Sequence, residues 1–158
     1  MLHINLIVLG KLKEKYWVEA EKEYLKRLQS FAKVKITELK EESFSQKDNF
    51  EVVKKREAEK LKKVIPENSF VIVLDSKGKE FSSEDFSGKL KELEQAGEFR
   101  SVSFIIGGPL GLDKEILDIA NLKLSFSKMT FTHQMIRVFL LEQTYRGFMI
   151  KENRKYHY

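Results

Sequence analysis

The chain has 158 residues, of which 42% are hydrophobic and 34% are charged, and it contains no cysteine. This length and composition indicate one globular domain over residues 1–158, and they exclude disulfides, zinc fingers and iron–sulfur clusters. No apolar run approaches the ~20 residues that are needed to cross a bilayer. The first residues lack the basic and apolar regions of a signal peptide, so we expect a cytoplasmic protein without a metal.

The formal net charge of +5 is concentrated near one end of the chain. Residues 128–158 contain six basic and two acidic side chains, whereas the preceding 127 residues contain 23 basic and 22 acidic ones. A local excess of positive charge is typical of a surface that faces phosphates. A solvated basic tail is the alternative interpretation.

The first half of the chain predicts strands that alternate with helices. In chain order these are a strand at residues 3–9, a helix at 14–29, a strand at 34–39 and a helix from 48 to about 64. The first helix repeats apolar residues every three or four positions, as an amphipathic helix does. Asp48 followed by Glu51 resembles a capping box, and Pro66 marks where the second helix has ended.

The second half continues the alternation. It predicts a strand at residues 70–74, a helix at 82–97, a strand at 101–106, a short helix at 112–120, a strand at 122–126 and a long helix at 133–150. The strand at 70–74 is a continuous apolar run, which indicates that both faces of the sheet are covered, and the strand at 101–106 is predicted to be a second buried one. Ser82 and Thr132 are placed to cap the helices that follow them. The fold class is therefore α/β, with a mainly parallel sheet flanked by helices.

In such sheets, ligands bind beyond the carboxyl ends of the strands, which here are residues 74–78, 107–111 and 126–132. The sequence Gly-Gly-Pro-Leu-Gly at 107–111 lets a ligand approach the backbone, but it matches neither a dinucleotide-binding nor a Walker motif. A tight turn with no ligand is an equal alternative there, and residues 75–79 alone predict only a polar turn. The loop at 125–133 mixes hydroxyl groups, aromatic rings and a methionine, which must either join the core or cover a ligand.

The last helix carries two pairs of polar residues at a spacing of four, His133 with Arg137 and Glu142 with Arg146, so each pair shares a helix face. The second pair is either an ordinary surface ion pair or a sign that Arg146 is functional. We expect His133 to be a packing or cap-region residue. The final Tyr-His-Tyr, residues 156–158, is too aromatic for a disordered tail and indicates docking against another surface.

The chain closely resembles the RlmH family, the ribosomal RNA large subunit methyltransferase H proteins, in IIGGPLGL (105–112), LSFSKMTFTHQMIRVFLLEQTYRGF (124–148) and the terminal YHY. The segments VLGKLKEKYWVEAEKEYLKRL (8–28) and VLDSKGKEFSS (73–83) fit the same pattern, so the resemblance spans nearly the whole chain. It implies a SPOUT-type α/β knot, in which the C-terminal part is threaded into a trefoil knot, and a homodimer.

The resemblance further implies an S-adenosylmethionine-dependent enzyme that methylates N3 of a pseudouridine in 23S rRNA within the ribosome. Carried over by position, the cofactor contacts are Leu74, Gly108, Ser127, Lys128, Met129, Thr130, Phe131 and Thr132. Family members commonly have Pro-His where this chain has Thr132-His133. No metal is implied.

Loss of the N3 proton leaves a negative charge on the nucleobase, which a cation can stabilise and a neutral histidine can help to form. Arg137 and His157 are the candidates for these two roles, and Tyr156 is the candidate for stacking on a base. A non-catalytic ribosome- or RNA-binding factor on the same fold is the main alternative. A nucleotide-binding protein of flavodoxin-like type is a third, although the phosphate-loop motifs are missing.

Overall fold

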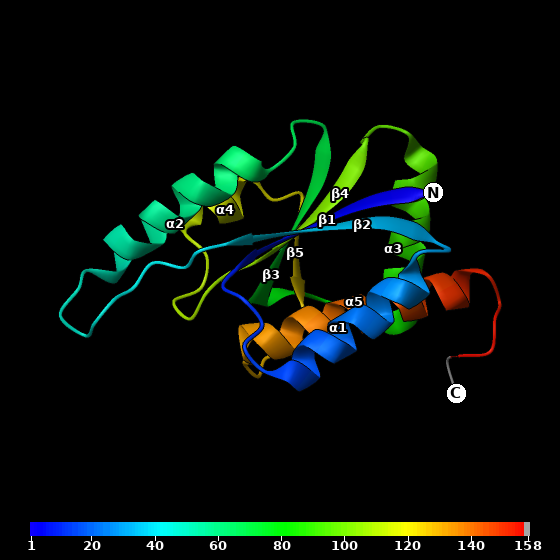
Figure 1. The fold of residues 1–158 in the computed structure, drawn as a ribbon. Coiled ribbons are helices and arrows are strands. Elements are labelled where there is room, and N and C mark those ends of the chain that lie inside the picture. Colours follow the sequence, from blue (N-terminus) through cyan, green and yellow to red (C-terminus); the bar gives the residue numbers. More distant parts are fainter. Residues whose placement is uncertain (157–158) are drawn as a thin grey trace.

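The computed structural model describes residues 1–156, in which the strands form one five-stranded sheet (Figure 1). The strands are β1 (Leu2–Leu9), β2 (Ala32–Leu39), β3 (Ser69–Glu80), β4 (Ser101–Ile106) and β5 (Leu122–Ser125). Their spatial order is β2-β1-β4-β3-β5, and every neighbouring pair is parallel. The predicted α/β class with a mainly parallel sheet is confirmed, while the trefoil knot stays a prediction.

Helices cover both faces of the sheet, as expected for buried parallel strands. They are α1 (Lys15–Leu28), α2 (Phe50–Val64), α3 (Ser83–Ala96), α4 (Lys114–Ile119) and α5 (His133–Lys151). In Figure 1, α2 and α4 lie on one face, and α1, α3 and α5 lie on the other, where α5 contacts both α1 and α3. Among residues 1–156, no helix is both long enough and apolar enough to cross a membrane.

Strand β1 shows why the sheet must be covered by helices on both faces. Leu6 and Val8 pack into the core beneath α1, α3 and α5, whereas Ile7 and Leu9 pack into the core beneath α2 and α4. All four side chains are at most 2% exposed. Since successive strand residues point to opposite faces, a continuous apolar run is stable only between two helical layers.

Strand β3 is longer than its apolar run, so the prediction of a polar turn at residues 75–79 is wrong. The strand continues to Glu80, and its pairing with β5 shifts between Leu74 and Lys79, as at a β-bulge. Gly78 makes this close pairing possible, because a Cβ atom there would lie 2.6 Å from the backbone carbonyl carbon and oxygen of Lys123. A glycine within a strand often marks such an approach of two backbones.

The start of α2 also differs from its prediction. The capping residue is Asn49, whose side chain accepts a hydrogen bond from the Glu51 amide at 3.0 Å. Asp48 is not available, because its carboxylate accepts hydrogen bonds from the backbone and the hydroxyl of Ser45. The predicted caps Ser82 and Thr132 are confirmed, since each side chain accepts a first-turn amide of its helix.

Candidate cofactor cleft and C-terminal polar network

A cleft of about 970 Å³ lies at the carboxyl edge of the sheet, beside the bulged part of β3, the ends of β4 and β5 and the start of α5. The structure brings together seven of the eight residues that the sequence assigned to a cofactor. Those that line the cleft are Leu74, Gly108, Ser127, Met129, Thr130, Phe131 and Thr132. Lys128 lies in the same loop but is not among the lining residues. The volume suits a small ligand, for which sites typically measure ~300–1,000 Å³.

Hydroxyl groups hold the loop after β5 in shape. The Ser125 hydroxyl lies 3.0 Å from the carbonyl oxygen of Ser127 and 3.2 Å from that of Ser76, so it links the loop to β3. The Ser127 hydroxyl accepts the Met129 amide at 3.0 Å. Two apolar side chains remain at the surface of this ordered loop, with Met129 75% and Phe131 40% exposed. The loop therefore offers apolar surface to a ligand or to another chain.

Arg137 lies on α5 directly after Ile136, the last helix residue that lines the cleft, and is almost completely buried. Its Nε donates to Glu21 on α1, and its Nη1 donates to Glu38 on β2 at 2.8 Å. Arg137 is not among the residues that line the cleft. The guanidinium thus holds three elements together, and the prediction that it faces a nucleobase does not fit this placement.

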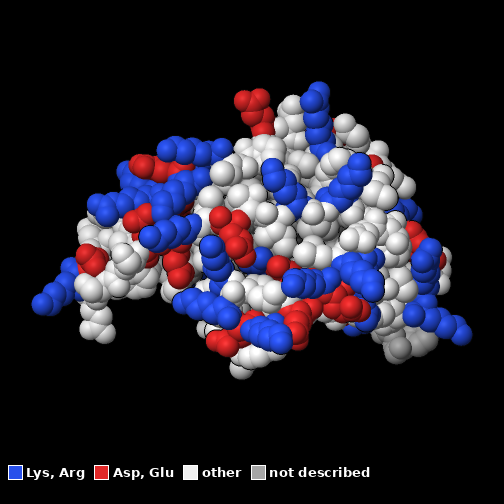
Figure 2. All heavy atoms as spheres, in the orientation of Figure 1, with Lys and Arg blue, Asp and Glu red and all other residues white. Residues whose placement is uncertain are grey.

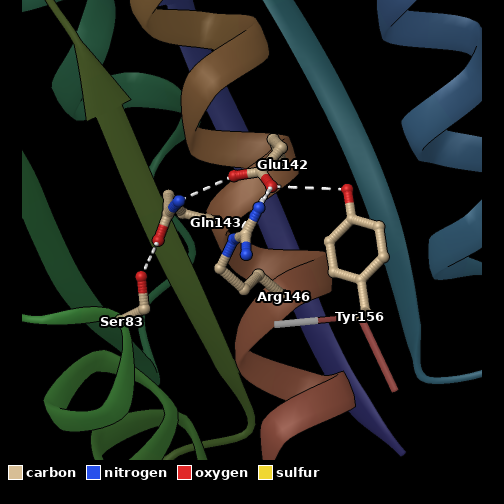
Figure 3. A network of polar contacts seen from close by, with 5 residues as sticks. All are labelled: Ser83, Glu142, Gln143, Arg146 and Tyr156. Carbon is tan, nitrogen blue, oxygen red and sulfur yellow. Dashed lines mark hydrogen bonds and ion pairs between the residues drawn. The ribbon is translucent and has the colours of Figure 1, made fainter. Parts of the chain in front are cut away.

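The C-terminal half of α5 carries a second polar cluster, shown in Figure 3, which we call the Glu142 network. Glu142 Oε1 accepts two hydrogen bonds from Arg146, at 3.0 and 2.6 Å, and one from the Tyr156 hydroxyl at 3.3 Å. The Arg146 guanidinium lies 4.9 Å from the centre of the Tyr156 ring. Gln143 donates to the other Glu142 oxygen and accepts from Ser83. The predicted Glu142–Arg146 pair is therefore part of a larger arrangement.

The Glu142 network changes the acidity of two of its members. Burial, followed by a hydrogen bond and charge repulsion from Tyr24, raises the pKa of Tyr156 well above its ordinary range. The hydrogen bond to Glu142 raises the pKa of Arg146 further. Tyr156 therefore keeps its phenolic proton at neutral pH, and Arg146 is a fixed cation with 24% of its side chain exposed.

Of the three predicted catalytic residues, the two that the structure describes, Arg137 and Tyr156, do not meet at the cleft within one chain. Arg137 is buried on the α1 side of the helix, and Tyr156 belongs to the Glu142 network. Glu142 is six residues beyond Ile136, the last residue of α5 that lines the cleft, so the network is displaced from the cleft by about 9 Å along the helix axis. His157 lies outside the described residues. A catalytic centre built from the cleft and the network needs a second chain or a substrate that spans both.

The basic excess near the C-terminus is largely paired. Ion pairs join Arg137 to Glu21 and Glu38, Arg146 to Glu142, Lys151 to Glu94 and Arg154 to Glu152. Figure 2 shows further Lys and Arg side chains over α2, a helix with six basic and three acidic residues. The sequence count near the C-terminus therefore overstates the charge that is free to meet phosphates there.

Sequence reasoning also missed two acidic residues beside the cleft, Glu41 after β2 and Glu57 on α2. Glu57 is only 4% exposed and accepts the Glu42 amide at 2.9 Å. A signal was present, because Glu57 stands four residues from both Val53 and Leu61 on the buried face of α2. A charged residue within an apolar stripe marks a buried polar site.

The structure is a parallel α/β protein with a cleft formed by the bulged part of β3 and by the loops after β4 and β5. A family model described as "Predicted SPOUT methyltransferase" matches residues 2–157. The ribosomal RNA large subunit methyltransferases H of Clostridium acetobutylicum and Leuconostoc mesenteroides are 48% and 45% identical to this chain, each over 99% of both chains. A probable methylase family protein from Haemophilus influenzae has the same fold, with a TM-score of 0.54 at 13% identity over 98% of this chain and 69% of its own.

The chain therefore belongs to the SPOUT methyltransferase family. The resemblance that its loop and helix motifs indicated is confirmed over nearly the full length. The roles of the individual cleft residues stay predictions, as does the single domain over residues 1–158.

Proposed function

We propose that the protein is a cytoplasmic S-adenosylmethionine-dependent methyltransferase that methylates N3 of a pseudouridine in 23S rRNA. The observation that supports this most is the cleft, in which seven residues assigned to the cofactor, from β3 and from the loops after β4 and β5, line one cavity. Their convergence is what cofactor binding requires, and a binder without a cofactor would have no need of it. The names of the full-length relatives support the choice of large-subunit rRNA.

The residues present fit such a cofactor. Leu74, Phe126 and Phe131 offer apolar surface for an adenine ring, and the glycines at 107 and 108 leave the backbone open to close contact. The bound cofactor supplies a methyl group on a positively charged sulfur. The task of the protein is to hold that methyl group in line with the nucleobase nitrogen, because positioning accounts for a large part of such catalysis.

We assign the nucleobase contact to Tyr156 and His157, as the sequence predicted, and move the cationic role from Arg137 to Arg146. Arg137 is held by Glu21 and Glu38 and acts as a positioning residue for α5. Arg146 is partly exposed, lies over the ring of Tyr156 and remains charged at any pH of interest. A fixed cation at this surface would stabilise the charge that develops on the pyrimidine oxygens when N3 loses its proton.

We propose that the enzyme is a homodimer in which the cleft of one chain faces the Glu142 network of its partner. The separation of about 9 Å along α5 between the cleft and the network within one chain favours this arrangement. The exposed Met129 and Phe131 supply apolar surface beside the cleft that a second chain would cover. If the protein is a monomer at micromolar concentration by light scattering and remains active, the dimer is excluded.

The direct test is methyl transfer. The purified protein, S-adenosylmethionine and ribosomes from a strain without this methyltransferase are expected to yield one N3-methylated pseudouridine, located by mass spectrometry of 23S rRNA fragments. Free 23S rRNA serves as the parallel substrate. Calorimetric titration with S-adenosylmethionine separates the enzyme from a non-catalytic RNA-binding factor, since absence of binding would favour the latter.

A further inference from the structure

Exposed apolar side chains gather at the start of α2. Of the eight large hydrophobic side chains that are exposed in residues 1–156, three lie within residues 44–52. They are Phe44 in the loop before the helix, Phe50 and Val52, with exposed fractions of 39%, 42% and 45%. The two phenylalanine rings meet edge to face, with their centres 5.6 Å apart. Apolar side chains that are clustered at the surface, instead of scattered singly, mark an interaction site.

The exposed face of α2 continues this apolar cluster with positive charge (Figure 2). Lys55, Arg56 and Lys63 are exposed, and none of them forms an ion pair within residues 1–156. The basic residues at 54, 60 and 62 are each paired with a glutamate. Positions 52, 55, 56, 59 and 63 are three or four residues apart, so they share the face opposite the buried side of the helix. Among the unpaired charges of this face, three cations therefore accompany one carboxylate, that of Glu59.

Together the two groups form what we call the α2 surface, made up of Phe44, Phe50, Val52, Lys55, Arg56 and Lys63. This surface adjoins the cleft, because Lys54, the neighbour of Lys55 on the helix, is one of the lining residues. In Figure 1, α2 lies on the opposite face of the sheet from α5, so a partner chain that packs against α5 does not have to cover it. An extended ligand that enters the cleft can therefore continue along α2.

The α2 surface fits RNA better than it fits other large partners. Unpaired lysine and arginine side chains neutralise phosphates, and exposed aromatic rings offer a face on which a base can stack. Lysine is under-represented in the interfaces between proteins, so the cations argue against a protein partner. A face that only kept the protein soluble would need the charges and not the phenylalanine rings.

We propose that the α2 surface binds the RNA substrate outside the nucleotide that is methylated. Its cations contact backbone phosphates, and the Phe44–Phe50 pair stacks against an unpaired base. The inference rests on the proposed function, because it names a second contact with the substrate of that function. Since the contact lies away from the reacting atoms, it contributes to the affinity for RNA and not to the binding of the cofactor.

Co-sedimentation with ribosomes from a strain without this methyltransferase, at a series of salt concentrations, tests the cations. The triple variant Lys55→Gln/Arg56→Gln/Lys63→Gln is expected to bind about tenfold more weakly or worse, and its plot of log affinity against log salt should be shallower by about 2–3. Glu59→Gln should instead bind more tightly than wild type, because it removes a charge that repels phosphates from the same face.

The matched control removes the same charge elsewhere. Lys33→Gln/Lys91→Gln/Arg100→Gln replaces three exposed cations that also form no ion pair within residues 1–156. Lys33 and Arg100 lie at the amino ends of β2 and β4, at the opposite edge of the sheet from the cleft. This control should bind ribosomes as wild type does. The inference is overturned if the α2 triple variant binds as tightly as the control, or if both lose the same affinity.

The aromatic pair is tested by Phe44→Ala, which should weaken ribosome binding about fivefold or more, because a base that stacks on a ring contributes that much. Calorimetric titration with S-adenosylmethionine is the check on the fold of every variant, since each is expected to bind the cofactor as wild type does. A Phe44→Ala variant with unchanged affinity for ribosomes would remove the rings from the contact and overturn the stacking part of the inference.

A photo-cross-link identifies the partner. The chain contains no cysteine, so Val52→Cys carries a single aryl azide label in the middle of the α2 surface. Illumination on the ribosome should attach the protein to rRNA, whereas attachment to ribosomal protein alone overturns the inference. Wild-type protein that binds ribosomes through α2 but transfers no methyl group would overturn the proposed function and leave the RNA contact in place. Wild-type protein that binds neither ribosomes nor free 23S rRNA overturns the inference.

Discussion

Helix α5 carries two arginines whose surroundings differ sharply. Arg137, in its N-terminal half, is 4% exposed and lies between carboxylates from α1 and β2. Arg146, in its C-terminal half, is 24% exposed, and its one carboxylate partner is on the same helix. One arginine connects layers of the fold, and the other presents a charge at the surface. Burial and the origin of the partner thus distinguish a cation that holds the fold together from one that is accessible to a substrate.

The largest effect that follows from this contrast is a loss of stability in Arg137→Ala. The substitution leaves Glu21 and Glu38 facing each other without a cation, and removing one partner of a buried ion pair costs about 3–5 kcal/mol. We expect about 3 kcal/mol, at the low end, because Glu38 is 31% exposed. Urea unfolding followed by circular dichroism measures the difference.

Arg137→Lys is the matched control, because it retains the charge on a single nitrogen and so cannot reproduce the fork by which Nε and Nη1 bond two carboxylates. It should recover part of the lost stability. If Arg137→Ala unfolds at the same urea concentration as wild type and yet abolishes methylation, then Arg137 acts on the substrate and the contrast between the two arginines fails.

The second prediction concerns Arg146→Ala, for which we expect lost turnover with little lost stability. A pair on one helix face contributes about 1 kcal/mol or less to folding. Removing a cation that stabilises charge in the transition state costs about 100-fold in kcat, or ~2.7 kcal/mol. Single-turnover methylation of ribosomes and urea unfolding of the same preparation measure the two effects. A variant that is destabilised as much as Arg137→Ala would assign both arginines to the fold.

The sequence predicted the elements of this fold well, but it could not separate these two arginines. Apolar runs and periodicity located the strands and helices, because cover on both faces of a sheet leaves a local pattern. In the sequence, His133–Arg137 and Glu142–Arg146 look alike, because each is a pair of polar residues four positions apart. The partners of Arg137 lie 116 and 99 residues away, so only the packed structure brings them together.

The candidate site likewise has a part that the sequence predicts and a part that it does not. Motifs identified the loops of the cleft, because each loop is a continuous stretch of sequence. Glu57 on α2, which accepts the Glu42 amide beside the Gly108 turn, belongs to no motif, because these neighbours come from distant segments. The extension of β3 through residues 75–79 was missed because strand pairing at a bulge depends on Gly78 and its neighbour Lys123.

A smaller effect is expected at the N-terminal end of α5, where Thr132 caps the helix beside the cleft. Thr132→Ala removes the acceptor for the Met135 amide, which lies at 3.3 Å, and should cost ~1 kcal/mol of stability. Thr132→Pro introduces the residue that relatives of the resembled family commonly have. Its fixed φ suits the observed value of −62°, so the proline variant should bind S-adenosylmethionine as wild type does. A proline variant that fails to bind would show that the hydroxyl group itself contacts the cofactor.

The smallest effect belongs to Tyr156→Phe, and its sign depends on pH. At pH 8 the variant loses the hydrogen bond to Glu142, so it should be less stable than wild type by ~0.5–1 kcal/mol. The pKa of Tyr156 is higher in the folded chain than in the unfolded one, so the stability that it contributes is present below pH 10 and is lost as the pH rises above that value. The gap between the two proteins should therefore narrow from pH 8 to pH 10.5 in paired urea unfolding curves. A gap that stays constant would mean that Tyr156 ionises as easily in the folded chain as in the unfolded one, and that the Glu142 network does not bury its hydroxyl in solution.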